Sequence, residues 1–155
     1  GHEHIAFIAE PDSYAVALDR VEGFKKACDK HGINQYEIYH ANPNRDEILA
    51  IIKEMKETAA CPTAIITSDS MININLLSAL YELNIRVPDE VMTATFNDSF
   101  INTFASPPQT VVNIYPEHLG EEAGIALIKL IENPNILRKN TIIPTDIIER
   151  KSTIK

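Results

Sequence analysis

The chain has little cysteine, a deficit of positive charge and no long apolar run. Its two cysteines are Cys28, within a predicted helix, and Cys61, just before a predicted strand. Both are better explained as small apolar residues than as a disulfide or a metal pair, so we expect a reducing, cytoplasmic location. No signal-peptide core is present and no apolar run approaches the roughly 18 residues of a membrane span, so no membrane association is expected.

The charge balance limits the partners of this chain. Its 14 basic and 22 acidic residues give a net charge of −8. Such a charge argues against direct binding of phosphate backbones or anionic membranes. Any contact with DNA must therefore be made by a part of the protein outside these residues.

The sequence also lacks the motifs of cofactor and catalytic sites. The first predicted strand is followed by Glu10-Pro11-Asp12 rather than by glycines, which excludes a phosphate-binding loop at that position. The histidines show no metal-ligand spacing beyond His2-x-His4, and no serine lies in a nucleophile elbow. We expect no cofactor, no metal site and no catalytic site, and hence not an enzyme.

A phosphorylated receiver domain is an alternative, because it shares the sheet type predicted below. Asp69 occupies the position of its phosphorylated aspartate, after the third strand. The acids after the first strand are separated by a proline, and the expected lysine near a later strand end is absent. This alternative is disfavoured.

Strands and helices alternate along residues 1–96. Apolar runs over 5–9, 35–39, 63–67 and 91–96 predict strands. Helical spacing predicts three intervening helices, the first capped by Asp12-Ser13 and ended by Gly32, the second capped by Asn44, the third spanning 70–83. Four strands joined by three helices predict an α/β fold with a doubly wound parallel sheet.

The alternation stops after residue 96. The polar, proline-bearing segment that follows is interpreted as a crossing segment, with a strand only at 110–114. A helix is predicted over 117–132 and a last strand over 141–148, interrupted by Pro144. The charged tail 149–155 is expected to fray.

Polar residues follow each predicted strand. In chain order they are Glu10, Asp12, Ser13, His40, Asn42, Ser68, Asp69, Asn97 and Asp98. In an open parallel sheet, ligands bind beyond the carboxyl ends of the strands. A rim of carboxylates, amides and hydroxyls suits a neutral sugar, whose hydroxyls need both donors and acceptors. The alternative, that these residues are helix caps and turn formers, stays open.

Seven short motifs, in order, resemble the effector-binding core of the lactose-repressor/galactose-repressor (LacI/GalR) family of transcription regulators. They are Gly1-His2-x-x-Ile5-Ala6-Phe7-Ile8, Arg20-x-x-Gly23-Phe24, Pro62-Thr63-Ala64 with Ser68-Asp69, Val87-Pro88 with Phe96-Asn97-Asp98, Pro107-Pro108-Gln109-Thr110, Leu119-Gly120, and Ile143-Pro144-Thr145 with Arg150-Lys151-Ser152-Thr153. The segments 96–110 and 142–153 are most similar to maltose-operon repressors. The resemblance covers nearly the whole chain and implies a periplasmic-binding-protein-like fold.

The resemblance implies a function and a site. We expect an effector-sensing fragment of a sugar-responsive transcriptional repressor, with a maltose-type sugar as ligand. By position, Arg20 would donate to sugar hydroxyls, and Asn97 with Asp98 would accept from them. Ser68 stands where the family usually has asparagine, so a hydroxyl or a water would replace the amide there. Asp69, Asp12 and His40 complete the predicted site.

The resemblance also implies a division of the chain and a set of partners. Residues 1–109 would form the C-terminal effector-binding subdomain, 110–140 would cross to an N-terminal subdomain, and 141–155 would return as strand and tail. The DNA-binding headpiece, the hinge helix and that N-terminal subdomain are not in this chain. The implied partners are a sugar effector, a second copy in a homodimer, operator DNA through the headpiece, and a co-repressor protein as a further option.

In this arrangement the helix over 117–132 lacks the sheet on which it would pack. Its apolar residues Leu119, Leu127, Leu130 and Ile131 would then form an exposed patch that promotes swapping or a non-native dimer.

Two rival functions stay open. A periplasmic sugar-binding protein for transport shares the architecture, although the motif order favours a regulator, and turnover of a sugar would instead indicate an enzyme.

Overall fold

One six-stranded sheet organises the chain, and five of its strands are parallel. The computed structural model describes residues 1–57, 61–137 and 139–154. The strands are β1 (His4–Ala9), β2 (Gln35–His40), β3 (Ala64–Thr67), β4 (Met92–Phe96), β5 (Thr110–Asn113) and β6 (Asp146–Ile148). Their order is β2-β1-β3-β4-β5-β6, and β6 alone runs antiparallel, against β5. The predicted doubly wound sheet is confirmed.

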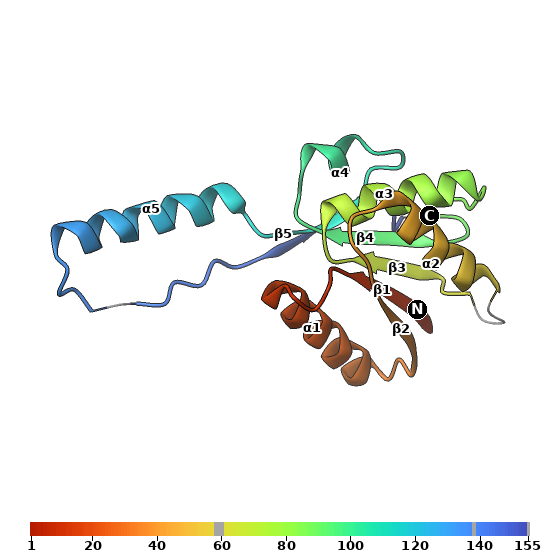
Figure 1. Cartoon of the computed structure of the whole chain (residues 1–155), viewed down its shortest axis with the longest axis horizontal. Coiled ribbons are helices and arrows are strands. Elements are labelled where there is room, and N and C mark those ends of the chain that lie inside the picture. The colour runs from red at the N-terminus through yellow and green to blue at the C-terminus, as the bar shows by residue number, and fades with distance from the viewer. Residues whose placement is uncertain (58–60, 138, 155) are drawn as a thin grey trace.

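Helices cover the two faces of the sheet unequally (Figure 1). They are α1 (Ala15–His31), α2 (Arg45–Glu57), α3 (Ser70–Glu82), α4 (Phe100–Phe104) and α5 (Pro116–Glu132). The chain moves from β1 to β2 in one direction and from β2 through β3 to β4 in the other. Right-handed crossovers therefore place α1 on one face and α2 with α3 on the opposite face. None of the described helices is long and apolar enough to cross a bilayer.

Each face has its own apolar core, because neighbouring side chains of a strand point to opposite sides. Ile8 packs with Ile52 of α2 and Leu76 of α3. Its neighbour Phe7 packs on the other face against Phe24 of α1, with ring centroids 5.0 Å apart. The apolar residues whose helical spacing predicted α2 include Ile48, Ile52 and Met55, all of which are buried.

The two predicted helix caps had different outcomes. Asn44 caps α2, since its side-chain oxygen accepts from the backbone N–H groups of Asp46 and Glu47 at 3.0 and 3.2 Å. The predicted Asp12-Ser13 cap of α1 is wrong. That helix follows Tyr14, whose side chain makes no capping bond. Asp12 instead lies 3.3 Å from the imidazole of His40, so its carboxylate joins two strand ends.

The segment after β4 does not cross away from the sheet at once. It forms the short helix α4, which packs against α3 through a buried bond from the Asn73 amide to the Asn102 oxygen at 3.0 Å. The amide of Asn73 also lies 3.4 Å from the oxygen of Gln109, and Thr93 donates to that oxygen at 2.7 Å. A five-residue helix is too short for helical periodicity to reveal it. The chain extends away from the sheet only after β5.

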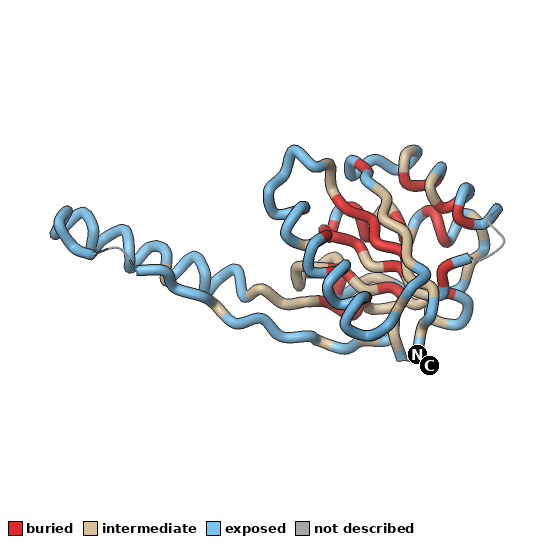
Figure 2. Tube along the Cα trace, turned by 90° about the horizontal axis from the view of Figure 1, so that it is seen from below, coloured by how far each residue is buried: buried red, intermediate tan, exposed pale blue. Residues whose placement is uncertain are grey.

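The helix α5 and the chain that follows it form an arm that extends away from the sheet (Figures 1 and 2). None of the residues of α5 is buried. The predicted last strand over 141–148 is wrong in length, since only Asp146–Ile148 pairs with β5. Pro144 lacks the N–H that a ladder requires, which explains the shorter strand.

The tail is held by the sheet, so the prediction that it frays is wrong for residues 149–154. Ser152 is fully buried. Its hydroxyl accepts from the Thr110 N–H at 2.8 Å and donates to the Thr93 carbonyl at 2.6 Å. The tail thereby bridges β4 and β5, and residue 155 lies outside the described residues.

Candidate functional site at the carboxyl edge of the sheet

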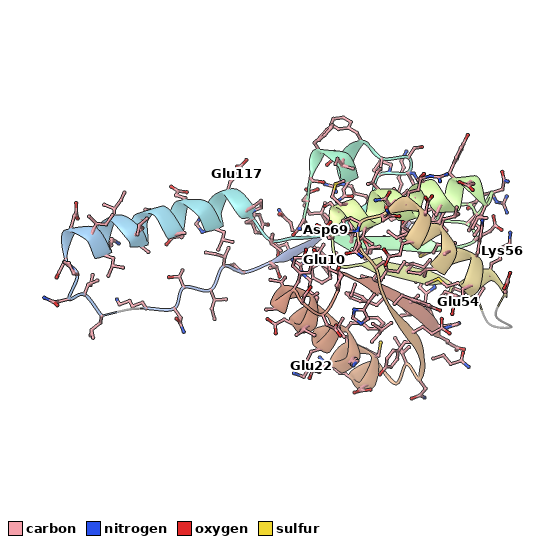
Figure 3. All side chains as sticks on the ribbon, viewed as in Figure 1. Glu10, Glu22, Glu54, Lys56, Asp69 and Glu117 are labelled. Carbon is pink, nitrogen blue, oxygen red and sulfur yellow. The ribbon has the colours of Figure 1, made fainter. Side chains whose placement is uncertain are left out.

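The carboxyl ends of the parallel strands gather the predicted polar residues along one edge. This follows from topology, because parallel strands all end on the same side. Figure 3 labels Glu10 and Asp69 at this edge, beside the base of the α5 arm. Two neighbouring groups of side chains occupy the edge, one centred on Arg20 and one on Asp98.

Arg20 of α1 is anchored by contacts to three strand ends. Its guanidinium donates to the carbonyl of Ser68, after β3, at 2.6 Å. It lies over the ring of Phe96, the last residue of β4, 4.9 Å from the centroid. The carboxylate of Glu10, after β1, is 3.8 Å away. Only 16% of the Arg20 side chain is exposed, so this cation is positioned rather than free in solvent.

Around Arg20, polar contacts connect the ends of β1, β2 and β3. The hydroxyl of Ser68 accepts from the Glu10 N–H at 2.9 Å and lies 3.5 Å from the Glu10 carboxylate. The imidazole of His40 is 3.1 Å from the Glu10 carbonyl and 3.3 Å from Asp12. This part of the edge therefore holds a carboxylate, a hydroxyl, an imidazole and a guanidinium within a few contacts of one another, and Ser68, which carries the hydroxyl, is fully buried.

The second group is an ion pair between Asp98 and Arg150. Two guanidinium nitrogens of Arg150 donate to the two carboxylate oxygens of Asp98 at 2.9 and 2.8 Å. Arg150 also donates to the carbonyl of Gln109 at 2.9 Å. The pair ties the end of β4 to the chain that follows β6. Both oxygens of the predicted ligand residue Asp98 thus accept from Arg150, a cation whose role here no local sequence pattern indicates.

Asn97 joins the two groups and has an unsatisfied buried atom. It follows Phe96 directly and has a φ of 68°, the left-handed conformation that asparagine tolerates. Its carbonyl accepts from the amide of Asn102 at 2.9 Å and from the hydroxyl of Ser70 at 3.2 Å. Its side-chain oxygen is buried and has no hydrogen-bond partner among the described residues. A buried acceptor without a partner costs about 1–3 kcal/mol, so this oxygen is suited to a bound donor.

The remaining predicted residues have structural contacts. Asp69 caps α3, accepting from the Met71 N–H at 2.6 Å, as the alternative explanation of these residues had allowed. Asp12 is 69% exposed, and Asn42 bonds to Glu47 at 3.3 Å rather than to the edge. Within residues 1–57, 61–137 and 139–154, no group of three or more histidines, cysteines or acidic residues could hold a metal ion.

An apolar groove, here called the α1 groove, lies between α1 and the strands β4, β5 and β6. Its volume is about 630 Å³. Its lining residues are Phe7, Val16, Asp19, Arg20, Gly23, Phe24, Ala27, Ile66, Ala94, Thr95, Phe96, Thr110, Val111, Val112 and Ile147. Arg20 lines it, but neither Asn97 nor Asp98 does. The predicted sugar-binding residues Arg20, Asn97 and Asp98 therefore do not share this groove, whose apolar walls do not suit a sugar.

A mostly parallel sheet with hydrogen-bond donors and acceptors along its carboxyl edge is the architecture of a small-molecule-binding domain. The chain belongs to the periplasmic binding protein-like domain family, whose model matches residues 1–153, in the form found in LacI-type transcription regulators.

Relatives of known name are transcription regulators. Over 153 residues the chain is 44% identical to the HTH-type transcriptional regulator MalR of Staphylococcus xylosus, covering 99% of this chain and 45% of that protein. A probable maltose operon transcriptional repressor from Staphylococcus aureus superposes with a TM-score of 0.91 at 37% identity, over 100% of this chain and 55% of that one. A complex of the regulator CelR with cellobiose superposes with a TM-score of 0.86 at 25% identity, over 98% and 47%. The chain thus spans about half the length of the curated relatives it matches.

Proposed function

We propose that this chain is the effector-sensing part of a sugar-responsive transcriptional repressor, and that its ligand is a maltose-type sugar. The observation that carries the proposal is the buried side-chain oxygen of Asn97, which has no hydrogen-bond partner among the described residues and directly follows Phe96, the residue over whose ring the Arg20 guanidinium lies. A sugar hydroxyl can donate to this oxygen and accept from the guanidinium. The similarity to MalR and to the maltose repressor structure supports the choice of sugar.

The other predicted site residues differ in how closely they would contact the sugar. Ser68 and Glu10 offer a hydroxyl and a carboxylate next to Arg20. His40, 38% exposed, and Asp12 lie further along the rim, where they would meet the outer part of a disaccharide. Asp98 acts mainly by holding the strand end on which Asn97 lies, because Arg150 engages both of its oxygens.

The proposal includes the division of an intact regulator. Residues 1–109 form its C-terminal effector-binding subdomain, 110–140 cross to an N-terminal subdomain, and 141–155 return. The exposed arm of α5 supports this division, since a helix with several exposed aliphatic residues is expected to pack on something. The intact protein would be a cytoplasmic homodimer that contacts a palindromic operator through a separate headpiece. A co-repressor protein could act in addition to the sugar.

The proposed mechanism is a shift between two arrangements of the subdomains. The sugar binds between them and stabilises the closed arrangement more than the open one. The spacing of the headpieces then changes, and the affinity for the operator changes with it. Coupling energies of this kind are typically about 1–3 kcal/mol.

The test is calorimetry of the full-length protein against maltose, cellobiose and ribose, with operator release as a second readout. Asn97→Ala should weaken binding of the bound sugar by about tenfold or more, since it removes the acceptor that the sugar would satisfy. Arg20→Lys should weaken it as well, because lysine cannot reproduce the planar contacts of the guanidinium. The control Arg86→Lys, at an exposed ion pair away from the edge, should leave affinity unchanged.

Each rival function predicts a different outcome of this experiment. Sugar binding that has no effect on operator affinity would favour a transport-type binding protein. Conversion of the sugar to product would indicate an enzyme. Unchanged affinity in Asn97→Ala, with the variant folded, would refute the assignment of the site.

A further inference from the structure

Three buried amide side chains form a network that connects α3, α4 and the start of β5. They are Asn73 of α3, Asn102 of α4 and Gln109, which directly precedes β5, and all three are fully buried. The amide nitrogen of Asn73 donates to the side-chain oxygen of Asn102 at 3.0 Å and lies 3.4 Å from that of Gln109. Because residues of this chain alone bury these side chains, the network needs no other segment to complete it.

Backbone carbonyls at both ends of the network fix the orientation of its amides. A carbonyl oxygen can only accept a hydrogen bond, so the nitrogen of a side-chain amide must face it. The nitrogen of Asn102 faces the carbonyl of Asn97 at 2.9 Å, and that of Gln109 faces the carbonyl of Pro107 at 2.6 Å. The side-chain oxygens of both amides therefore point towards Asn73, which supplies the donor.

The short helix α4 contributes mainly Asn102 to the interior. Among the five residues of α4, all within the described part of the chain, only Asn102 is buried, and the aromatic residues Phe100 and Phe104 are 73% and 80% exposed. The nitrogen of Asn102 donates to the Ser70 hydroxyl and to the Asn97 carbonyl, both at 2.9 Å, while its oxygen accepts from α3. Burying an amide costs stability unless its bonds are made, so its use here in place of an apolar residue indicates a requirement for position rather than for packing.

The bonds to the backbone of Asn97 set the direction of its side chain. Asn97 has a φ of 68°, and its N–H donates to the Val112 carbonyl of β5 at 3.0 Å. Its own carbonyl accepts from Asn102 at 2.9 Å and from Ser70 at 3.2 Å. The first bond restrains rotation about N–Cα and the other two restrain rotation about Cα–C, so tertiary contacts hold the left-handed conformation. They thereby place the side-chain oxygen that is buried without a partner among the described residues.

We propose that Asn102 is a positioning residue of the sugar site, supported by Asn73 and Ser70. It does not touch the sugar. It holds the carbonyl of Asn97 in the orientation that directs the side-chain oxygen of Asn97 at a sugar hydroxyl, and Gln109 holds the amide of Asn73 in place. This inference rests on the proposed function, since it concerns the acceptor of the same site.

The first experiment measures the affinity of the full-length protein for maltose by calorimetry. Asn102→Ala should lower the affinity about fivefold or more, because the donors that orient the acceptor are lost. Ser70→Ala should have a smaller effect, since the carbonyl of Asn97 keeps the shorter of its two bonds. The matched control is Asn75→Ala, which removes an amide of α3 that donates to the Met71 carbonyl of the same helix at 2.8 Å, and it should leave the affinity unchanged.

A double-mutant cycle separates positioning from a loss of stability. Asn97→Gly removes the acceptor and retains the positive φ, which glycine adopts without strain. Asn102→Ala added to Asn97→Gly should then lower the maltose affinity by less than about twofold. Ile52→Val lowers stability in the core against α2, away from the network, and should not change the affinity of the folded protein. An equal loss from Asn102→Ala in both backgrounds, or an unchanged affinity in folded Asn102→Ala, overturns the proposal.

The second experiment needs no ligand and separates this inference from the proposed function. The crystal structure of full-length Asn102→Ala should show the Asn97 carbonyl turned and its φ and ψ changed, whereas that of Asn75→Ala should keep a φ near 68°. An unchanged Asn97 backbone in Asn102→Ala overturns the proposal whatever the affinities are. An unaltered protein that binds no maltose would refute the maltose-type ligand, and the structure of the variant would then decide whether Asn102 positions Asn97.

Discussion

Breaking the ion pair between Asp98 and Arg150 should destabilise the fold far more than breaking a solvated pair of equal length. The two side chains are 22% and 17% exposed, and the guanidinium makes three bonds, two to Asp98 and one to the Gln109 carbonyl. Fully buried pairs cost 3–5 kcal/mol when one partner is removed. Because some exposure remains here, Arg150→Met should lower the free energy of unfolding by about 2–3 kcal/mol.

The companion variant and a double-mutant cycle test the origin of that loss. Asp98→Asn keeps the shape of the side chain and should cost about 1–2 kcal/mol, since arginine retains its bond to Gln109. The double variant should show a coupling of about 1 kcal/mol or more. The matched control is Arg86→Met, which breaks an Arg–Glu contact of 2.9 Å whose side chains are 72% and 46% exposed. That control should leave stability nearly unchanged.

Urea denaturation followed by circular dichroism is the assay, at a single protein concentration for all variants. The slope of free energy against urea should be equal in all variants, which shows that two-state unfolding holds. Equal losses for Arg150→Met and Arg86→Met would refute the reasoning, since burial would then not distinguish the two pairs. A coupling energy near zero would do the same.

Two further predictions concern titratable side chains. Burial and the bond to Glu37 raise the pKa of Tyr39 to about 12, above its unfolded value near 10, so its stabilising contribution is complete below pH 10 and is lost as the pH rises towards 12. The stability of Tyr39→Phe, measured by urea unfolding at pH 9 and 11.5, should therefore fall less than that of the unaltered chain, and an equal fall would contradict the assignment. Cys28 is 2% exposed and Cys61 is on the surface, and burial raises the pKa of both thiols. A thiol reagent should label one residue in the folded chain and two in urea, and fast labelling that persists in Cys61→Ser would show that the core around Phe7 and Phe24, which contains Cys28, is open.

Much of the fold could be predicted because its residues are locally patterned. Apolar runs and helical stripes located four parallel strands and three helices, and Asn44 was identified as a cap from its position alone. The short helix α4 was missed because its five residues carry no periodic pattern. The cap of α1 was wrongly placed, since Asp12 has a more distant partner in His40 that no local pattern reveals.

The candidate site was predictable in its location but not in its contacts. Topology dictates that residues after parallel strands share an edge, so the sequence was enough to place Ser68 and Asn97 at one edge of the sheet, whereas Arg20, which lies in α1, was predicted there only from the family resemblance. Which of these groups remain free for a ligand depends on bonds between distant segments. The pairing of Asp98 with Arg150 spans 52 residues and engages both carboxylate oxygens of a residue predicted to bind the ligand.

By itself the sequence determined the class of sheet, the faces of the helices and the edge where polar residues collect, because each of these follows from spacing along the chain. Only the tertiary structure decided that the Asn97 side-chain oxygen is buried with no hydrogen-bond partner in the described part of the chain. It also decided that Ser152 holds the tail to the sheet, and that α5 and the α1 groove are exposed. The physical reason is that burial and hydrogen-bond satisfaction depend on segments that meet in space. Such long-range contacts depend on how the whole chain packs, and they cannot be read from a short stretch of sequence.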